Sequence, residues 1–137
     1  MSDYLDPNNE ELLKDFFAEA TSQVESLEQN VLVLENDPGN KDAIDEIFRA
    51  AHTIKGASGV IECHFIENFM HKVENLLDRL RNDEIAVSAE LTGLLLRCCD
   101  HMGRLMDVLE AGQPEPDADV QAQGEQLQGE LGRYVAG

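Results

Sequence analysis

The sequence predicts an all-α protein that folds as an antiparallel (up-down-up-down) four-helix bundle with a fifth helix at its C-terminal end. Three observations support this prediction. Apolar residues recur at intervals of three and four rather than two, which favours helices over strands. The prolines lie between the periodic segments, and the connections are short, as in antiparallel bundles. The length of 137 residues suits one domain with one core.

The first two helices are predicted on either side of a Pro-Gly turn. The first runs from about Asn9 to Glu35, and Asn8 with Glu11 three residues later resembles a capping box at its start. The second runs from about Lys41 to Val60, and Asn40 at the end of the turn is its expected N-cap.

The third helix is predicted from about Phe65 to Arg81, and the fourth from an N-cap at Ser88 to Gly112. Together the four helices form a bundle over residues 1–112. In residues 113–137 apolar residues become sparse, so this segment is either a weak fifth helix or the start of an interdomain linker. The helical spacing there is kept by Val120, Leu127, Leu131 and Tyr134.

The charge excludes several classes of partner. The chain has 28 acidic residues against 10 lysines and arginines, a net charge of −18. Nucleic acids and anionic membrane surfaces both require clustered basic residues, so neither is an expected partner. Apolar runs are too short to span a membrane, and the N-terminal residues lack the basic and apolar regions of a signal peptide. We therefore expect a cytoplasmic protein.

The most unusual segment surrounds His52 on the second helix. When Ala51 is placed at the centre of the buried stripe, His52 falls about 100° away, at the edge of the buried face. Lys55 and Gly56 are its surface neighbours, and Gly59 lies one turn further along. Glycines cost about 1 kcal/mol each in a helix relative to alanine. The two glycines leave bare backbone by which a partner could reach the imidazole, or they accommodate a close helix contact.

The pattern meets the requirements of a phosphoryl-accepting imidazole. Such a ring must be neutral at the attacking nitrogen, and its other nitrogen needs an acceptor that fixes the tautomer. A nearby cation offsets the incoming negative charge, and Lys55 can provide it. On the next helix Glu74 falls at the edge of the buried face, with His71 three residues before it. Glu74 is the predicted acceptor.

A family resemblance rests on the same residues. His-Thr-Ile-Lys-Gly-Ala-Ser-Gly from His52 resembles the phosphorylation motif of histidine phosphotransfer (HPt) domains. The preceding Phe-Arg-Ala-Ala, and His71 with Glu-Asn-Leu-Leu-Asp from Glu74, resemble the N-terminal HPt domain of CheA-type chemotaxis histidine kinases. The resemblance covers about residues 9–111. It departs at Glu62, where the family usually has a glycine in the turn.

The resemblance implies a role for each residue of the site. His52 would be the phospho-accepting histidine, and Glu74 would hydrogen-bond its second nitrogen. Lys55 and His71 would help to organise the site, with Lys55 supplying charge for the phosphate. Gly56, with Gly59 behind it, would leave room for partners. The family also implies a fifth helix.

The implied function is that of the phosphotransfer domain of a two-component kinase. A histidine kinase catalytic domain, in the same chain or in a dimeric partner, would present ATP with magnesium. A response-regulator receiver domain would then take the phosphoryl group on an aspartate. The chain has no phosphate-cradling Gly-x-x-x-x-Gly-Lys loop, so we expect it to bind no cofactor and to be no autonomous enzyme.

Two alternatives belong to other functional classes. One is a structural bundle that docks a partner helix, for which His52 would be dispensable. The other is a metal-binding bundle that uses cysteine and histidine ligands, but no Cys-x-x-Cys or His-x-x-x-His spacing is present, so no metal site is predicted. The residues of ligand type are Cys63, His64, Cys98, Cys99 and His101.

Overall fold

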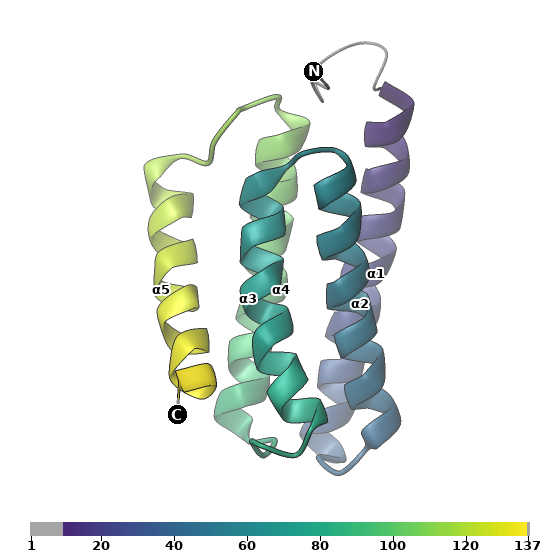
Figure 1. Cartoon of the computed structure of the whole chain (residues 1–137), viewed down its shortest axis with the longest axis vertical. Helices are drawn as coiled ribbons and strands as arrows, with labels where there is room; N and C mark the ends of the chain where they lie inside the picture. The colour runs from purple at the N-terminus through teal and green to yellow at the C-terminus, as the bar shows by residue number, and fades with distance from the viewer. Residues whose placement is uncertain (1–9, 137) are drawn as a thin grey trace.

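Four of the helices form a closed antiparallel bundle, and the fifth packs on its outside (Figure 1). The structure, a computed structural model, describes residues 10–136. Each helix of the bundle contacts two neighbours of the four, whereas α5 contacts only α3 and α4. The predicted all-α fold with a fifth helix is therefore confirmed. The helices are α1 (Glu10–Asn36), α2 (Lys41–Val60), α3 (His64–Arg81), α4 (Ala89–Glu110) and α5 (Ala118–Ala136).

Side-chain caps start two of the helices where the sequence predicts them. The Asn40 side chain accepts a hydrogen bond from the backbone N–H of Ala43 at 3.0 Å. The Ser88 hydroxyl accepts one from Leu91 at 3.1 Å. Each cap satisfies a backbone donor that the first turn of a helix leaves free. The capping box predicted at Asn8 lies outside the described residues.

The turn between α2 and α3 contains the departure from the family pattern. Glu62 adopts a φ of 59°, in the left-handed region that glycine occupies without steric cost. A residue with a side chain pays about 1–2 kcal/mol there, which explains why glycine suits this position. Glu62 takes the same conformation, so the hairpin that pairs α2 with α3 is kept.

The core lies between α1, α2, α3 and α4 and fixes which face of each helix points outward. On α2 the inner stripe includes Ile47, Ala51 and Ile54, all fully buried. Burying a large aliphatic side chain stabilises the fold by about 1.5–3 kcal/mol, so rotating α2 about its axis would be costly. The position of His52, next to Ala51, follows from this arrangement.

The last helix docks through a buried histidine rather than remaining a linker. His101 on α4 is only 2% exposed, and its ring lies 4.7 Å from that of Phe69. Its Nδ1 donates to the Gln123 side-chain oxygen at 2.9 Å, which also accepts from Arg104 at 2.8 Å. A Cβ at Gly124 would come within 2.9 Å of His101 Nε2, so glycine is what lets α5 approach.

Acid is expected to weaken the fold through His101. Burial lowers the pKa of His101, and the nearby Arg104 lowers it further, although the hydrogen bond to Gln123 opposes them. The unfolded chain therefore binds a proton more readily, and the free energy of unfolding falls as pH drops below about 6.5. Between pH 7 and 5.5 the melting temperature should fall more in the wild type than in His101→Gln. An equal fall of the melting temperature in the two proteins would contradict this assignment. The control is His71→Gln, which replaces an exposed histidine and should behave like the wild type.

Polar contacts hold the other end of α5. Arg79 on α3 donates to the backbone carbonyl oxygens of Tyr134 and Val135, which the end of a helix leaves without partners. Arg97 on α4 forms a two-pronged ion pair with Glu130 at 2.7 and 2.8 Å. None of the helices within residues 10–136 is long and apolar enough to cross a bilayer.

Candidate functional site

His52 projects from α2 beside the seam with α3. Its neighbour Ala51 and the residue two positions on, Ile54, are completely buried, whereas the His52 side chain is 62% exposed. The predicted place at the edge of the buried face is therefore confirmed. The ring can be reached from solvent while its backbone is held by a packed helix.

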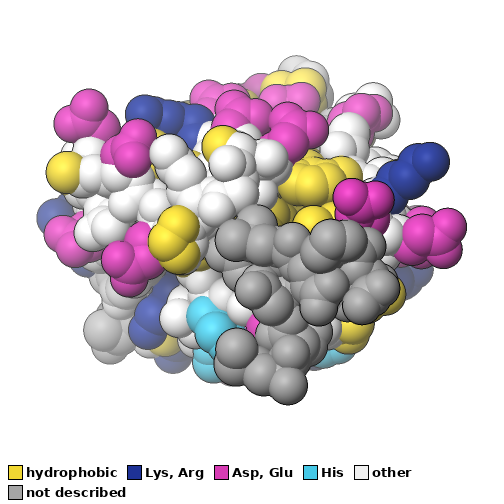
Figure 2. Space-filling model, turned by 90° about the horizontal axis from the view of Figure 1, so that it is seen from above, with side chains coloured by type: hydrophobic (Ala, Val, Ile, Leu, Met, Phe, Trp, Pro, Cys, Tyr) yellow, Lys and Arg dark blue, Asp and Glu magenta, His cyan; other side chains and the backbone are white. Residues whose placement is uncertain are grey.

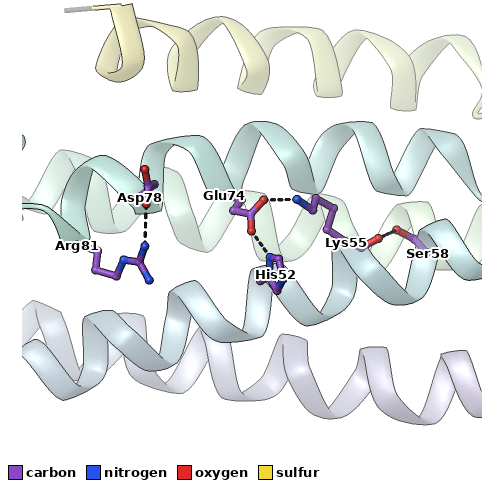
Figure 3. A network of polar contacts seen from close by, with 6 residues as sticks. All are labelled: His52, Lys55, Ser58, Glu74, Asp78 and Arg81. Atoms are coloured by element: carbon purple, nitrogen blue, oxygen red, sulfur yellow. Dashed lines mark hydrogen bonds and ion pairs between the residues drawn. The ribbon is translucent and has the colours of Figure 1, made fainter.

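Glu74 on α3 joins His52 to Lys55 (Figure 3). One carboxylate oxygen, Oε2, is hydrogen-bonded to His52 Nδ1. The other, Oε1, accepts from Lys55 Nζ at 2.5 Å. Glu74 thus lies at the edge that faces α2, where the helical spacing placed it, and it is only 8% exposed. Both of its hydrogen-bond partners, His52 and Lys55, come from α2.

The contacts of Glu74 determine which nitrogen of His52 is free. Burial raises the pKa of Glu74, but the hydrogen bonds and positive charge of Lys55 and His52 outweigh it, and the pKa lies below its usual value. The carboxylate is thus ionised at neutral pH and can only accept hydrogen bonds. His52 Nδ1 must then carry the proton, and in the neutral ring Nε2 keeps its lone pair on the side away from Glu74.

The register of the α2–α3 hairpin explains how residues 22 positions apart meet. The helices run antiparallel, so a step of seven residues toward the start of α2 is matched by a step of seven residues toward the end of α3. Gly59 faces Glu67 at one end of this stretch, and His52 faces Glu74 at the other. The short turn after α2 sets the register, so the pairing of His52 with Glu74 could be predicted from the sequence.

The other two polar residues of the predicted site differ in their placement. Lys55, whose side chain is 27% exposed, is bonded to Glu74 and so lies in the cluster. His71 is exposed one turn before Glu74. Within residues 10–136 it forms no hydrogen bond or ion pair with His52, Lys55 or Glu74. The structure brings three of the four polar site residues together.

The two glycines of the motif have different surroundings. A Cβ at Gly56 would have no atom within 4 Å, so the surface beside Lys55 is open. A Cβ at Gly59 would lie 2.9 Å from the Glu67 carboxylate. The helix surface at Gly56 is therefore open, whereas Gly59 makes the close helix contact that the sequence left open as an alternative.

Charge is distributed unevenly over the bundle. Helix α1 carries seven acidic residues and one lysine, whereas α2 and α3 each carry three acidic and three basic residues. The end of the bundle where α1 begins also presents many acidic side chains (Figure 2). A polyphosphate is repelled by an acidic surface, so the α2–α3 face is the side that such a ligand can approach.

The residues of metal-ligand type are separated or engaged elsewhere. Cys63, Cys98 and Cys99 are buried free thiols, and burial raises the pKa of Cys98 and Cys99 to about 12. His101 bonds to Gln123. Across residues 10–136 no three His, Cys, Asp or Glu side chains are grouped so that they could hold a metal ion.

A cleft of the described chain lies away from the histidine cluster. It has a volume of about 710 Å³ and lies between α3, α4 and α5, with Phe65, Phe69 and Val120 among its lining residues. None of the predicted site residues lines it. The His52 side chain is instead 62% exposed, which suits a residue that a partner's active site must reach.

Two residues near His52 escaped the sequence reasoning as parts of the site. The Phe48 ring lies parallel to the His52 ring, and the Arg81 guanidinium lies over Phe48. The i,i+4 spacing of Phe48 and His52 could have indicated the first contact. The contact between Arg81 and Phe48 follows from the hairpin register. Phe48 lies four residues before His52, so it lies opposite Asp78, four residues after Glu74, and Asp78 is the partner of Arg81.

Known proteins are similar to this chain in both sequence and fold. The chain is similar to the chemotaxis protein CheA of Treponema pallidum (strain Nichols), with 52% identity over 114 residues. These residues are 83% of this chain and 14% of that protein, so the chain spans about a seventh of the relative's length.

Two solved structures agree with the fold, and a family model agrees with the sequence. The CheA phosphotransferase domain from Thermotoga maritima is 32% identical, with a TM-score of 0.68 over 72% of this chain and 94% of that one. A solution structure of the histidine phosphotransfer domain of CheA is 28% identical, with a TM-score of 0.73 over 87% and 90%. The Hpt domain model matches residues 11–105. The chain therefore belongs to the Hpt domain family.

Proposed function

We propose that this chain carries phosphoryl groups on His52 within a chemotaxis-type two-component system. The observation that supports it is the hydrogen bond between His52 Nδ1 and the ionised Glu74, which places the proton of the neutral ring on Nδ1 and the lone pair on Nε2 of an exposed ring. A nucleophile toward phosphorus needs a lone pair and an open approach, and Nε2 has both. Nε2 is therefore the proposed site of phosphorylation.

The proposed transfer requires little of the chain beyond His52 and its acceptor. The Nε2 lone pair forms a bond to the γ-phosphorus of ATP while the bond from that phosphorus to the bridging oxygen breaks, and ADP leaves with the electron pair. Positive charge develops on the imidazole as Nε2 is substituted. Glu74 stabilises that charge through the Nδ1 proton.

Lys55 and His71 have supporting roles in the proposal. Lys55 holds the second oxygen of Glu74 and so fixes the carboxylate that orients the ring. Its ammonium group also places a positive charge next to the site that receives the phosphate. His71, exposed one turn away, would support the site only when a partner or the phosphate is present.

The partners supply the remaining chemistry. A histidine kinase catalytic domain would bind ATP and magnesium, and an aspartate of a response-regulator receiver domain would accept the phosphoryl group from His52. The relatives named CheA support this assignment, and Gly56 provides open helix surface beside the ring. The pathway operates in the cytoplasm, where we place the chain.

The proposal is tested by incubating the chain with ATP, magnesium and the kinase core of a CheA protein. We expect an acid-labile, base-stable phosphate on the chain, and its loss when a receiver domain is added. A phosphate-free chain in the presence of an active kinase core would contradict the proposal and favour a structural bundle.

A further inference from the structure

We propose that Phe48, held in place by Arg81, is a positioning residue for the His52 ring. The inference rests on the proposed function of His52 and adds a second contact to the one made by Glu74. Phe48 lies one turn before His52 on the same exposed edge of α2 and is half-buried. The proposal assigns the orientation of the imidazole to two residues, one at its edge and one beside its plane.

The relation between the two rings supports this proposal. Their planes are within 8° of parallel, and their centroids lie 6.2 Å apart. This is the offset arrangement that aromatic pairs favour. Two rings on one helix face can adopt many relative tilts, so near-parallel planes indicate that the Phe48 and His52 rings pack together.

Arg81 fixes the Phe48 ring from the neighbouring helix. Its Cζ lies 3.9 Å from the centroid of Phe48, well within the range of a cation–π contact. Its Nη2 donates to Asp78 at 3.0 Å, and Figure 3 shows this pair on the turn of α3 that follows Glu74. The series Asp78, Arg81, Phe48 and His52 thus runs across the seam beside the hydrogen bond that His52 donates to Glu74.

A second contact is needed because one hydrogen bond does not define a ring's orientation. Glu74 holds Nδ1, but the imidazole can still tilt about the axis of that bond, and tilting swings Nε2. In-line attack on phosphorus requires Nε2 to point along one direction. Packing against Phe48 restricts the tilt, so the nucleophile is held ready before a partner arrives.

The test compares Phe48→Leu with a matched control. Leucine keeps an apolar side chain on α2 but removes the aromatic face, and Phe48→Tyr restores that face. Phe17→Leu removes another half-buried phenylalanine, on α1, away from His52. With a CheA kinase core, ATP and magnesium, we expect the initial phosphorylation rate of Phe48→Leu to fall about fivefold, with Phe48→Tyr and Phe17→Leu near the wild-type rate.

Nuclear magnetic resonance of the His52 ring provides a readout that does not depend on the kinase. In Phe48→Leu we expect greater ring mobility on the nanosecond scale with Nδ1 still protonated, because Glu74 remains. Arg81→Ala, an exposed change, should increase the mobility in the same direction. Wild-type ring mobility in Phe48→Leu, or a phosphorylation rate equal to that of Phe17→Leu, would overturn the inference.

The outcome for Phe48 is distinguishable from that for the proposed function. If the wild-type chain accepts phosphate and Phe48→Leu is as fast as the control, only the positioning role fails. If the wild-type chain accepts no phosphate at His52, the proposed function fails, and the resonance data alone decide whether Phe48 orders the ring.

Discussion

Replacing His52 with glutamine is expected to abolish phosphorylation of the chain. An amide nitrogen has no available lone pair, so the substituted side chain cannot attack phosphorus. The His52 side chain is 62% exposed, and the hydrogen bond to Glu74 is its only polar contact within residues 10–136. The bundle should therefore fold normally, and the expected result is complete loss of acid-labile phosphate.

The measurement is label retained after incubation with labelled ATP, magnesium and a CheA kinase core. His64→Gln is the matched control, since it removes another exposed histidine, on the first turn of α3, and leaves His52 in place. The control should be labelled at the wild-type level. Full labelling of His52→Gln would show that the phosphate is carried elsewhere.

Most of the fold could be predicted from the sequence because each helix shows its own signals. The bounds of α2 are the predicted ones, since Asn40 caps its start and the turn at Ile61 ends it. The fourth helix ends at Glu110, two residues before the predicted Gly112, which instead takes a φ of 76° after the helix. A glycine at the end of a helix marks the residue that leaves it.

The fifth helix was harder to predict because its signal is weak alone. Val120, Leu127 and Leu131 give only a narrow apolar stripe, which is also compatible with a linker. Docking depends on tertiary contacts that no local pattern contains. His101 reaches Gln123 across the α4–α5 interface.

The residues of the site could be predicted from the sequence, but the burial of Glu74 could not. Helical spacing placed His52 and Glu74 on facing edges of two helices, and the structure joins them. Periodicity does not distinguish a buried edge position from an exposed one, and Glu74, bonded to His52 and Lys55, is only 8% exposed. The aromatic contact of Phe48 with His52 was missed because a phenylalanine beside the core stripe is first explained as part of the core.

Removing Glu74 should cause the second-largest loss of activity, and two substitutions separate its two roles. Glutamine at this position can still accept a hydrogen bond from His52 Nδ1 but carries no charge, whereas alanine provides neither an acceptor nor a charge. We expect Glu74→Ala to lower the initial phosphorylation rate about 100-fold and Glu74→Gln about tenfold. The difference measures how much of the effect comes from orientation and how much from charge.

The stability of these variants must be followed because Glu74 is buried. Glu74→Ala leaves Lys55 without its partner, but Lys55 and His52 both reach solvent and can be hydrated. The melting temperature should therefore change by only a few degrees, since a loss of about 1 kcal/mol shifts it by about 2–8 °C in domains of this size. Thermal melting in parallel with the phosphorylation assay separates a slower reaction from an unfolded chain.

The proton on the His52 ring provides the decisive comparison for Glu74. With the carboxylate present, Nδ1 carries the proton and Nε2 the lone pair. With alanine the neutral ring is free to exchange tautomers, and nitrogen chemical shifts of His52 should report a mixture. Glutamine, with its amide oxygen toward Nδ1, should keep the wild-type tautomer while the rate still falls, because the charge that stabilises the developing imidazolium has been removed. Equal rates in the wild type and Glu74→Ala would remove the carboxylate from the mechanism and leave His52 to react without it.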